Sequence, residues 1–171
     1  MSAATPEELL AFLDELGIEH STVEHPPLFT VEDSQALRGD LTGSHTKNLF
    51  LKDKKGRLFL VTCEESRKVN LKALEKELGS ARCSFGKPDL LTETLGVTPG
   101  AVTAFGLIND RAEPHRVHFA IDKILAEADR INCHPLHNAA TTAISSRDLL
   151  HFVAACGHEA QIIDFDRLAS E

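Results

Sequence analysis

The spacing of apolar residues predicts amphipathic helices near both ends of the chain. Leucines recur between Leu9 and Leu16 at intervals that place them on one helical face. The preceding Thr5–Glu8 has the residues of a capping box, and Gly17 is a typical helix stop. A second start signal, Ser145 followed three residues later by an aspartate, predicts a last helix that ends before Gly157.

Between these helices the pattern predicts a β-hairpin and several shorter elements. Apolar runs over residues 48–52 and 57–62 flank the polar turn Asp53–Gly56. A rigid Pro26-Pro27 bend precedes this region, and a short helix is expected from Thr30 to near Gly39. The other expected elements are strands over 18–24, 81–85, 116–121 and 159–165, and helices over 71–78, 87–96 and 122–129.

The order of these elements indicates the fold class. Helices and strands alternate without a strict strand–helix–strand repeat, so we expect an α/β (α+β) fold with a curved mixed sheet and helices outside it. The length of 171 residues fits one domain spanning residues 1–171. No apolar run approaches the length of a membrane span, and the N-terminus lacks a signal-peptide pattern.

Charge is distributed unevenly along the chain. The net charge is −8. Residues 1–37 carry eight acids and no Lys or Arg, residues 38–87 carry twelve basic and six acidic residues, and residues 88–171 carry six basic and twelve acidic residues. The basic third predicts a local site for a polyanion. The alternative, that these lysines only solvate surface elements, remains open.

Lys47 stands where the basic third passes from a polar loop into an apolar run. It follows the small, glycine-bearing stretch Gly39–Thr46 and directly precedes Asn48 and the apolar Leu49–Leu51. A lysine at such a junction is a partly desolvated cation that suits an anionic or strongly polar ligand. A lysine that merely edges the strand would fit the same pattern.

A second candidate is the stretch of small residues Gly96–Asp110, which contains Pro99-Gly100. Its glycines let the backbone approach a ligand closely, so its N–H groups could bind a carbonyl or oxyanion.

The sequence gives less support to nucleophilic catalysis by a serine or cysteine. The sequence has no nucleophile elbow, and Cys63 is more typical of a structural thiol than of a nucleophile. All four cysteines lie far apart and indicate reduced thiols in a cytoplasmic protein.

A zinc site is the remaining alternative. Cys133, His134 and His137 offer three ligands, but Pro135 interrupts the helix that would align them. We therefore expect no metal and no other cofactor.

Taken together, four motifs resemble the YbaK-like aminoacyl-tRNA deacylases, and most of all the stand-alone prolyl-tRNA editing proteins that remove alanine. The motifs occur in the family's order and cover nearly the whole chain. They are His25–Thr30 (HPPLFT), Thr46–Leu51 (TKNLFL), Gly96–Asp110 (GVTPGAVTAFGLIND), and His134–Asn138 (HPLHN) with Thr141.

The resemblance implies a partly closed barrel and hydrolysis of the ester that joins a wrong amino acid to the tRNA 3′ end. It implies that Lys47 is essential and that the backbone at Gly100 places water or the ester carbonyl. It also implies a small pocket that admits alanine and excludes proline. The implied substrate-binding residues are Phe29, Thr30, Asn48, Ala101, Val102, Thr103, His134 and Asn138.

The implied partners are the acceptor stem and aminoacylated 3′ end of tRNA, together with prolyl-tRNA synthetase, and we expect a monomer. Three alternatives stay open. The chain could act on cysteinyl- or seryl-tRNA, it could be a noncatalytic module that binds tRNA or a synthetase, or it could be a zinc hydrolase that uses Cys133 and His137.

Overall fold

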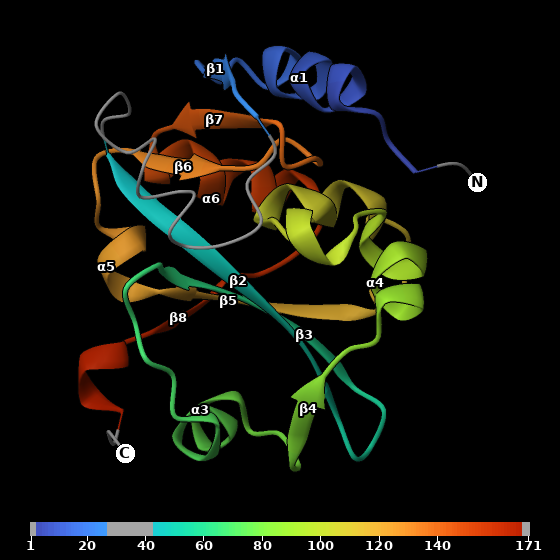
Figure 1. Cartoon of the computed structure of the whole chain (residues 1–171), viewed down its shortest axis with the longest axis vertical. Helices are drawn as coiled ribbons and strands as arrows, with labels where there is room; N and C mark the ends of the chain where they lie inside the picture. Colours follow the sequence, from blue (N-terminus) through green and yellow to red (C-terminus); the bar gives the residue numbers. More distant parts are fainter. Residues whose placement is uncertain (1–2, 27–42, 169–171) are drawn as a thin grey trace.

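The long strand β2 (Ser44–Asp53) runs through the centre of the molecule (Figure 1). The computed structural model describes residues 3–26 and 43–168. β2 forms the expected hairpin with β3 (Leu58–Glu64), and the register places Lys47 opposite Cys63. On its other side β2 pairs with two strands. Its first residues run parallel to β6 (Ile131–Cys133), and its last residues run antiparallel to β4 (Cys83–Phe85).

The remaining strands complete an eight-stranded mixed sheet with the order β1-β7-β6-β2-β3-β5-β8, to which β4 is attached through β2. Among the described residues the terminal strands β1 and β8 do not pair, so hydrogen bonds do not close the sheet into a barrel. The predicted mixed α/β fold is confirmed. The strands of this sheet not yet described are β1 (Ser21–Glu24), β5 (Val117–Asp122), β7 (Ala140–Ile144) and β8 (Gln161–Ile163).

Most of the helices begin and end where the sequence signals indicate. Thr5 and Glu8 form the capping box of α1, Asn70 caps α3, and Ser145 caps α6. Gly79 and Gly96 follow α3 and α4 in the left-handed conformation that favours glycine. The α-helices are α1 (Pro6–Glu15), α3 (Leu71–Leu78), α4 (Pro88–Leu95), α5 (Lys123–Ala126) and α6 (Ser146–Ala155).

Two apolar clusters form the core. The larger one joins the helices α1, α4 and α6 to the sheet through residues such as Leu13, Leu95 and Phe152. The smaller one lies under α3, where Leu74 packs with Leu51 and Phe59. In Figure 1 α3 and β4 accordingly lie at the opposite end of the molecule from α1.

Several elements differ from the expectations. β2 begins at Ser44, four residues earlier than expected, so Lys47 lies inside the strand. The strands β6 and β7 were not predicted, and α5 ends at Ala126, earlier than expected. The Pro26-Pro27 bend and the short helix expected from Thr30 lie wholly or partly outside the described residues. Within the described ranges, no helix is long and apolar enough to cross a membrane.

Candidate active site

Lys47 is half-buried on β2, and its ammonium is held by the backbone of another segment. Nζ donates a hydrogen bond to the carbonyl oxygen of Arg67, in the segment between β3 and α3. An ammonium has three N–H donors, so this bond fixes the direction of the cation and uses one donor. Lys47 is therefore half-buried and hydrogen-bonded, and its role in binding or catalysis stays a prediction.

The Arg67 side chain is itself clamped by two acids. Its Nε lies 3.0 Å from Asp122 Oδ2, and its Nη1 lies 2.6 Å from Asp166 Oδ1. Hydrogen bonding to Asp166, and then to Asp122, raises the pKa of Arg67, and the same contact lowers the pKa of Asp166. The buried Asp122 also accepts hydrogen bonds from the backbone N–H groups of Glu64 and Ile124. The segment that holds Lys47 is thus tied to β3, α5 and the C-terminal region.

Cys63, opposite Lys47, is not a nucleophile at neutral pH. Its side chain is fully buried in the smaller apolar cluster. Burial raises the pKa of the thiol to about 12, although the nearby Lys47 acts in the opposite direction. Because the thiolate is the reactive form, Cys63 is inert here.

Asn48 follows Lys47 and points to the other face of the sheet, since side chains alternate along a strand. Its Oδ1 accepts a hydrogen bond from Thr62 Oγ1 at 2.5 Å. The amide is therefore positioned by β3, on the face of the sheet opposite the Lys47 ammonium.

His134 lies at the same end of β2 as Lys47. The parallel pairing of β2 with β6 sets His45 opposite Asn132, and Lys47 and His134 each follow this pair by two residues. Thr46 Oγ1 reinforces the pairing by donating to the Asn132 carbonyl oxygen at 2.8 Å.

The His134 ring is packed among other polar groups. Its Nδ1 lies 3.1 Å from the Ala140 carbonyl oxygen, and its ring meets that of His25 edge to face. Burial, and then the neighbouring His25 and His137, lower the pKa of His134, so the ring is neutral at neutral pH. His25 Nε2 in turn lies 2.8 Å from Thr141 Oγ1. The first and last motifs of the sequence therefore meet. Asn138 is half-buried in the turn between β6 and β7.

The Gly96–Asp110 stretch is more regular than the open loop that the sequence suggested. It forms two 3₁₀ helices, η2 (Pro99–Ala101) and η3 (Ala104–Asn109). Ala101 is buried in the larger core, and the buried Thr103 accepts a hydrogen bond from the Phe105 N–H. The structure leaves Gly100 and Val102 half-buried. Phe29 and Thr30 lie outside the described residues.

Within the described residues, the ligand atoms of Cys133, His134 and His137 do not gather into a group of possible metal ligands. Cys133 is buried, and burial raises the pKa of its thiol to about 12. His137 Nδ1 accepts a hydrogen bond from the Ala139 N–H at 3.1 Å, so that nitrogen is already occupied. These side chains therefore have structural partners of their own.

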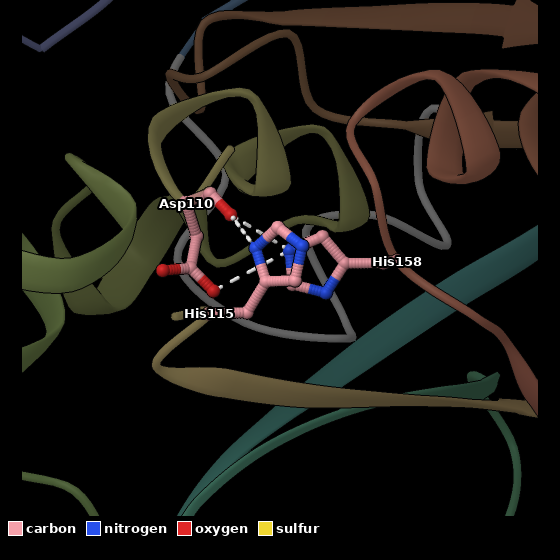
Figure 2. Close-up of side chains that lie close together, drawn as sticks. All are labelled: Asp110, His115 and His158. Atoms are coloured by element: carbon pink, nitrogen blue, oxygen red, sulfur yellow. Dashed lines mark hydrogen bonds and ion pairs between the residues drawn. The ribbon is translucent and has the colours of Figure 1, made fainter. Parts of the chain in front are cut away.

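Sequence reasoning missed a different cluster, Asp110, His115 and His158 (Figure 2), which is the group of possible metal ligands found within the described ranges. His115 Nδ1 and His158 Nε2 both lie within 2.9 Å of the Asp110 carbonyl oxygen. The Asp110 carboxylate accepts from the backbone N–H groups of Arg116 and Val117. His115 Nδ1, His158 Nε2 and the Asp110 carboxylate are engaged in these bonds, whereas His115 Nε2 is buried without a hydrogen-bond partner in the described part of the chain. Because most of its ligand atoms are already bonded within the cluster, the group fits a hydrogen-bonded junction better than a metal centre.

The two rings of this junction lie against each other at a tilt of 31°, with centroids 4.2 Å apart. Burial alone would lower the pKa of His158, but the hydrogen bonds to Asp110 outweigh it, so the net shift is upward. Burial would raise the pKa of Asp110, but the bonds from His158 and the two backbone N–H groups lower it. Nothing in the sequence signals this cluster, since His158 is 48 residues from Asp110.

Comparison with known proteins places this geometry in a family. Residues 25–152 match the family model described as the aminoacyl-tRNA editing domain. The chain is 36% identical to the prolyl-tRNA editing protein ProX of Acetoanaerobium sticklandii, over 96% of this chain and 99% of the relative. It is 39% identical to the prolyl-tRNA synthetase associated domain-containing protein 1 of Xenopus laevis, over 97% and 100%.

A solved structure shares the fold. It is described as a proposed trans-editing enzyme for prolyl-tRNA synthetase, and it superposes with a TM-score of 0.71 at 19% identity, covering 99% of this chain and 100% of that chain. The family match spans well over half of the sequence and includes Lys47, Gly100 and His134. The chain therefore belongs to the aminoacyl-tRNA editing domain family.

Proposed function

We propose that this chain is a trans-editing deacylase that hydrolyses the ester between alanine and the 3′-terminal adenosine of mischarged proline tRNA. The observation that carries the proposal is the Lys47 ammonium, which is fixed on the Arg67 carbonyl near the start of β2, where β2 pairs with β6 and His134 follows β6. Membership of the editing-domain family and the names of the relatives support the substrate class.

The reaction needs orientation and electrostatic help more than a strong nucleophile, because an aminoacyl ester is already activated. Water adds to the ester carbonyl, the bond to the ribose oxygen breaks, and the proton of the water passes to that oxygen. The products are free alanine and uncharged tRNA. The neighbouring ribose hydroxyl can carry the proton, so the site requires no dedicated general base.

Lys47 is the cation of this scheme. One N–H is used by Arg67, and the ammonium can direct further donors at a phosphate or at the oxygen that becomes negative in the transition state. The backbone at Gly100 and the half-buried Val102 are assigned to the ester end of the substrate, and His134, neutral through burial, to the pocket wall. No step requires a metal ion.

Selection by size explains why such an enzyme would be needed. A pocket built for proline cannot strongly exclude the smaller alanine, since one methylene contributes only about 1–3 kcal/mol of discrimination. A second pocket that admits only the smaller side chain corrects this error. We assign its walls to Phe29, Ala101, Val102 and His134, of which Phe29 lies outside the described residues.

The test is single-turnover deacylation of alanyl-tRNA for proline by the wild type and Lys47→Ala. Removing one preorganised donor of charge stabilisation is expected to slow turnover by about 10² to 10³. Lys55→Ala, an exposed lysine in the turn of the same hairpin, is the matched control and should behave as the wild type. Binding of uncharged tRNA should fall only modestly in Lys47→Ala.

A substrate panel decides the amino acid. Alanyl-, cysteinyl-, seryl- and prolyl-tRNA should be compared at equal concentrations, with alanyl-tRNA for proline cleaved fastest. Faster cleavage of cysteinyl- or seryl-tRNA would overturn the alanine assignment and keep the enzyme class. A wild type that binds tRNA and cleaves none of these substrates would instead be a noncatalytic binding module.

A further inference from the structure

Phe85 is an aromatic side chain in an unusual position for a core-forming residue. It ends the three-residue strand β4, and 62% of its surface is exposed, more than for the other large apolar side chains in the described parts of the chain. Its backbone is fixed at this place. Gly86 donates a hydrogen bond to the Phe50 carbonyl, and a Cβ at Gly86 would lie 2.4 Å from the Phe50 ring. Phe85 is therefore held outward by tight packing beneath it.

Positive charge surrounds this ring. A groove of about 780 Å³ is lined by Phe85 and by the cations Lys52, Lys54, Arg82 and Lys87. Among the acids that line it, Asp53 is buried and paired with Arg57 at 2.9 Å. The other two acids, Asp89 and Glu93, lie on α4. The side of the groove formed by β2 and β4 is therefore mainly positive. We call Lys52, Lys54, Arg82, Phe85 and Lys87 the β4 surface.

The β4 surface lies at a defined distance from Lys47. Phe85 pairs with Leu51, which is four residues beyond Lys47 on β2. Four strand residues span about 13 Å at about 3.3 Å per residue. Stacked nucleotides of one strand are about 3.4 Å apart, so about four of them cover this length. A strand whose last nucleotide lies at Lys47 can therefore reach Phe85 with its unpaired bases.

We propose that the β4 surface binds the acceptor end of tRNA, with Phe85 stacking on an unpaired base and the surrounding cations contacting phosphates. Stacking on an aromatic ring together with basic side chains is how proteins bind unpaired nucleic acid without reading its sequence. The positive surface lies in a chain of net charge −8, which favours a polyanion at this place over general binding. This inference rests on the proposed function, because the position of the 3′ end at Lys47 sets the distance.

The experiment measures the binding of uncharged tRNA and of an acceptor-stem RNA hairpin to the wild type, Phe85→Ala and Phe85→Tyr. Loss of one stacked base is expected to weaken binding of Phe85→Ala by roughly five-fold to a hundred-fold. Phe85→Tyr keeps the ring and should bind as the wild type. Ile162→Ala, which truncates another exposed apolar side chain on β8, is the matched control and should show no change.

Charge is tested separately through the salt dependence. Lys52→Ala and Lys87→Ala should each make the slope of log affinity against log salt shallower, by the amount that corresponds to about one phosphate contact. Arg147→Ala on α6 should leave the slope unchanged. Urea unfolding of each variant confirms that the fold is intact.

Two results would overturn the proposal. One is an RNA affinity of Phe85→Ala equal to that of the wild type. The other is an equal loss of RNA affinity in Phe85→Tyr and Phe85→Ala. Loss of synthetase binding with unchanged RNA affinity would assign the surface to a protein partner instead. Because uncharged RNA needs no hydrolysis, failure here differs from failure of the proposed function, in which the wild type binds RNA and cleaves no ester.

Discussion

Within the described residues, the ammonium of Lys47 is positioned by a main-chain carbonyl and is paired with no carboxylate. A carboxylate partner would neutralise the cation and compete with an anionic substrate, whereas the Arg67 carbonyl holds its direction and leaves its full charge. Asp122 and Asp166 are bound to the Arg67 side chain instead. This division of roles keeps a positive charge available for a ligand.

Val102 is the residue on which the size of the proposed pocket can be tested. It is half-buried between η2 and η3, so part of its side chain is accessible. Val102→Ala should enlarge the pocket and allow prolyl-tRNA to be hydrolysed, with a gain of about ten-fold or more for removal of steric exclusion. The measurement is the ratio of prolyl- to alanyl-tRNA deacylation rates.

Val97→Ala serves as the control for Val102→Ala, because Val97 is buried in the larger core beside the same 3₁₀ segment. It should lower stability and leave the substrate ratio unchanged. An unchanged ratio in Val102→Ala as well would mean that the pocket does not discriminate by volume.

The residue-level part of the site was only partly predictable. The position of Lys47 at the start of an apolar run indicated a partly desolvated cation, because that pattern is local. Its partner Arg67 and the acids that hold Arg67 come from three other elements, so no spacing in the sequence reveals them. The same holds for the Asp110–His158 contact across 48 residues.

At the scale of elements, the segment between β3 and α3 acts as a support for Lys47. Asp122→Asn should lower the free energy of unfolding by about 3–5 kcal/mol, because it removes one charge of a buried, hydrogen-bonded ion pair. Asp166 is mostly exposed, so Asp166→Asn should change stability little. Urea unfolding compares the two variants.

The Asp166→Asn variant also tests whether the Arg67 ion pairs position the Lys47 ammonium, apart from their effect on stability. With Arg67 held by Asp122 alone, the Lys47 ammonium should be less well fixed, and the single-turnover rate should fall a few-fold at unchanged tRNA affinity. Arg167→Gln, next to Asp166 in the short helix η4 (Phe165–Arg167), is the control. A normal rate in Asp166→Asn would show that Asp122 suffices to place the loop.

Elements with local sequence signals were predictable, whereas elements that depend on distant contacts were not. Capping residues and C-terminal glycines act within one helical turn, and the ends of α1, α3, α4 and α6 agree with them to within about two residues. β6 and β7 were missed because they are three and five residues long and obtain their stability from neighbouring strands. The Gly96–Asp110 stretch looked open because of its small residues, yet all residues from Ala101 to Ile108 except the half-buried Val102 are buried.

At the scale of the whole molecule, the Asp110 junction joins three segments that are distant in sequence. It connects the end of η3, the start of β5 and the turn between α6 and β8. The fold class was predictable because the alternation of elements spans the chain. The open edge of the sheet was not, since closure depends on whether β1 and β8 meet in space.

This junction predicts how stability depends on pH. The raised pKa of His158 contributes stability at pH values below its ordinary 6.5, and this is lost as the pH rises through the folded-state value. The lowered pKa of Asp110 contributes above its ordinary 3.8 and is lost as the pH falls through its folded-state value. Both contributions are therefore present between about pH 4 and 6.5.

His158→Gln should flatten the loss of stability above pH 6.5 in urea unfolding measured from pH 5 to 8. Each unit by which the folded pKa exceeds 6.5 contributes about 1.4 kcal/mol at low pH. His151→Gln, an exposed histidine on α6, should keep the wild-type profile. Parallel profiles for the wild type and His158→Gln would contradict the upward shift.

The double pairing of one edge of β2 restricts which length changes evolution can tolerate. Its first residues are hydrogen-bonded to β6 and its last residues to β4, while β3 follows the whole strand on the other edge. A single inserted or deleted residue between Lys47 and Leu51 would turn every later side chain to the opposite face. Natural variation in length should therefore accumulate in the hairpin turn at Lys54–Gly56. The interval between Lys47 and Leu51, which sets the distance from Lys47 to Phe85, should stay constant among related proteins.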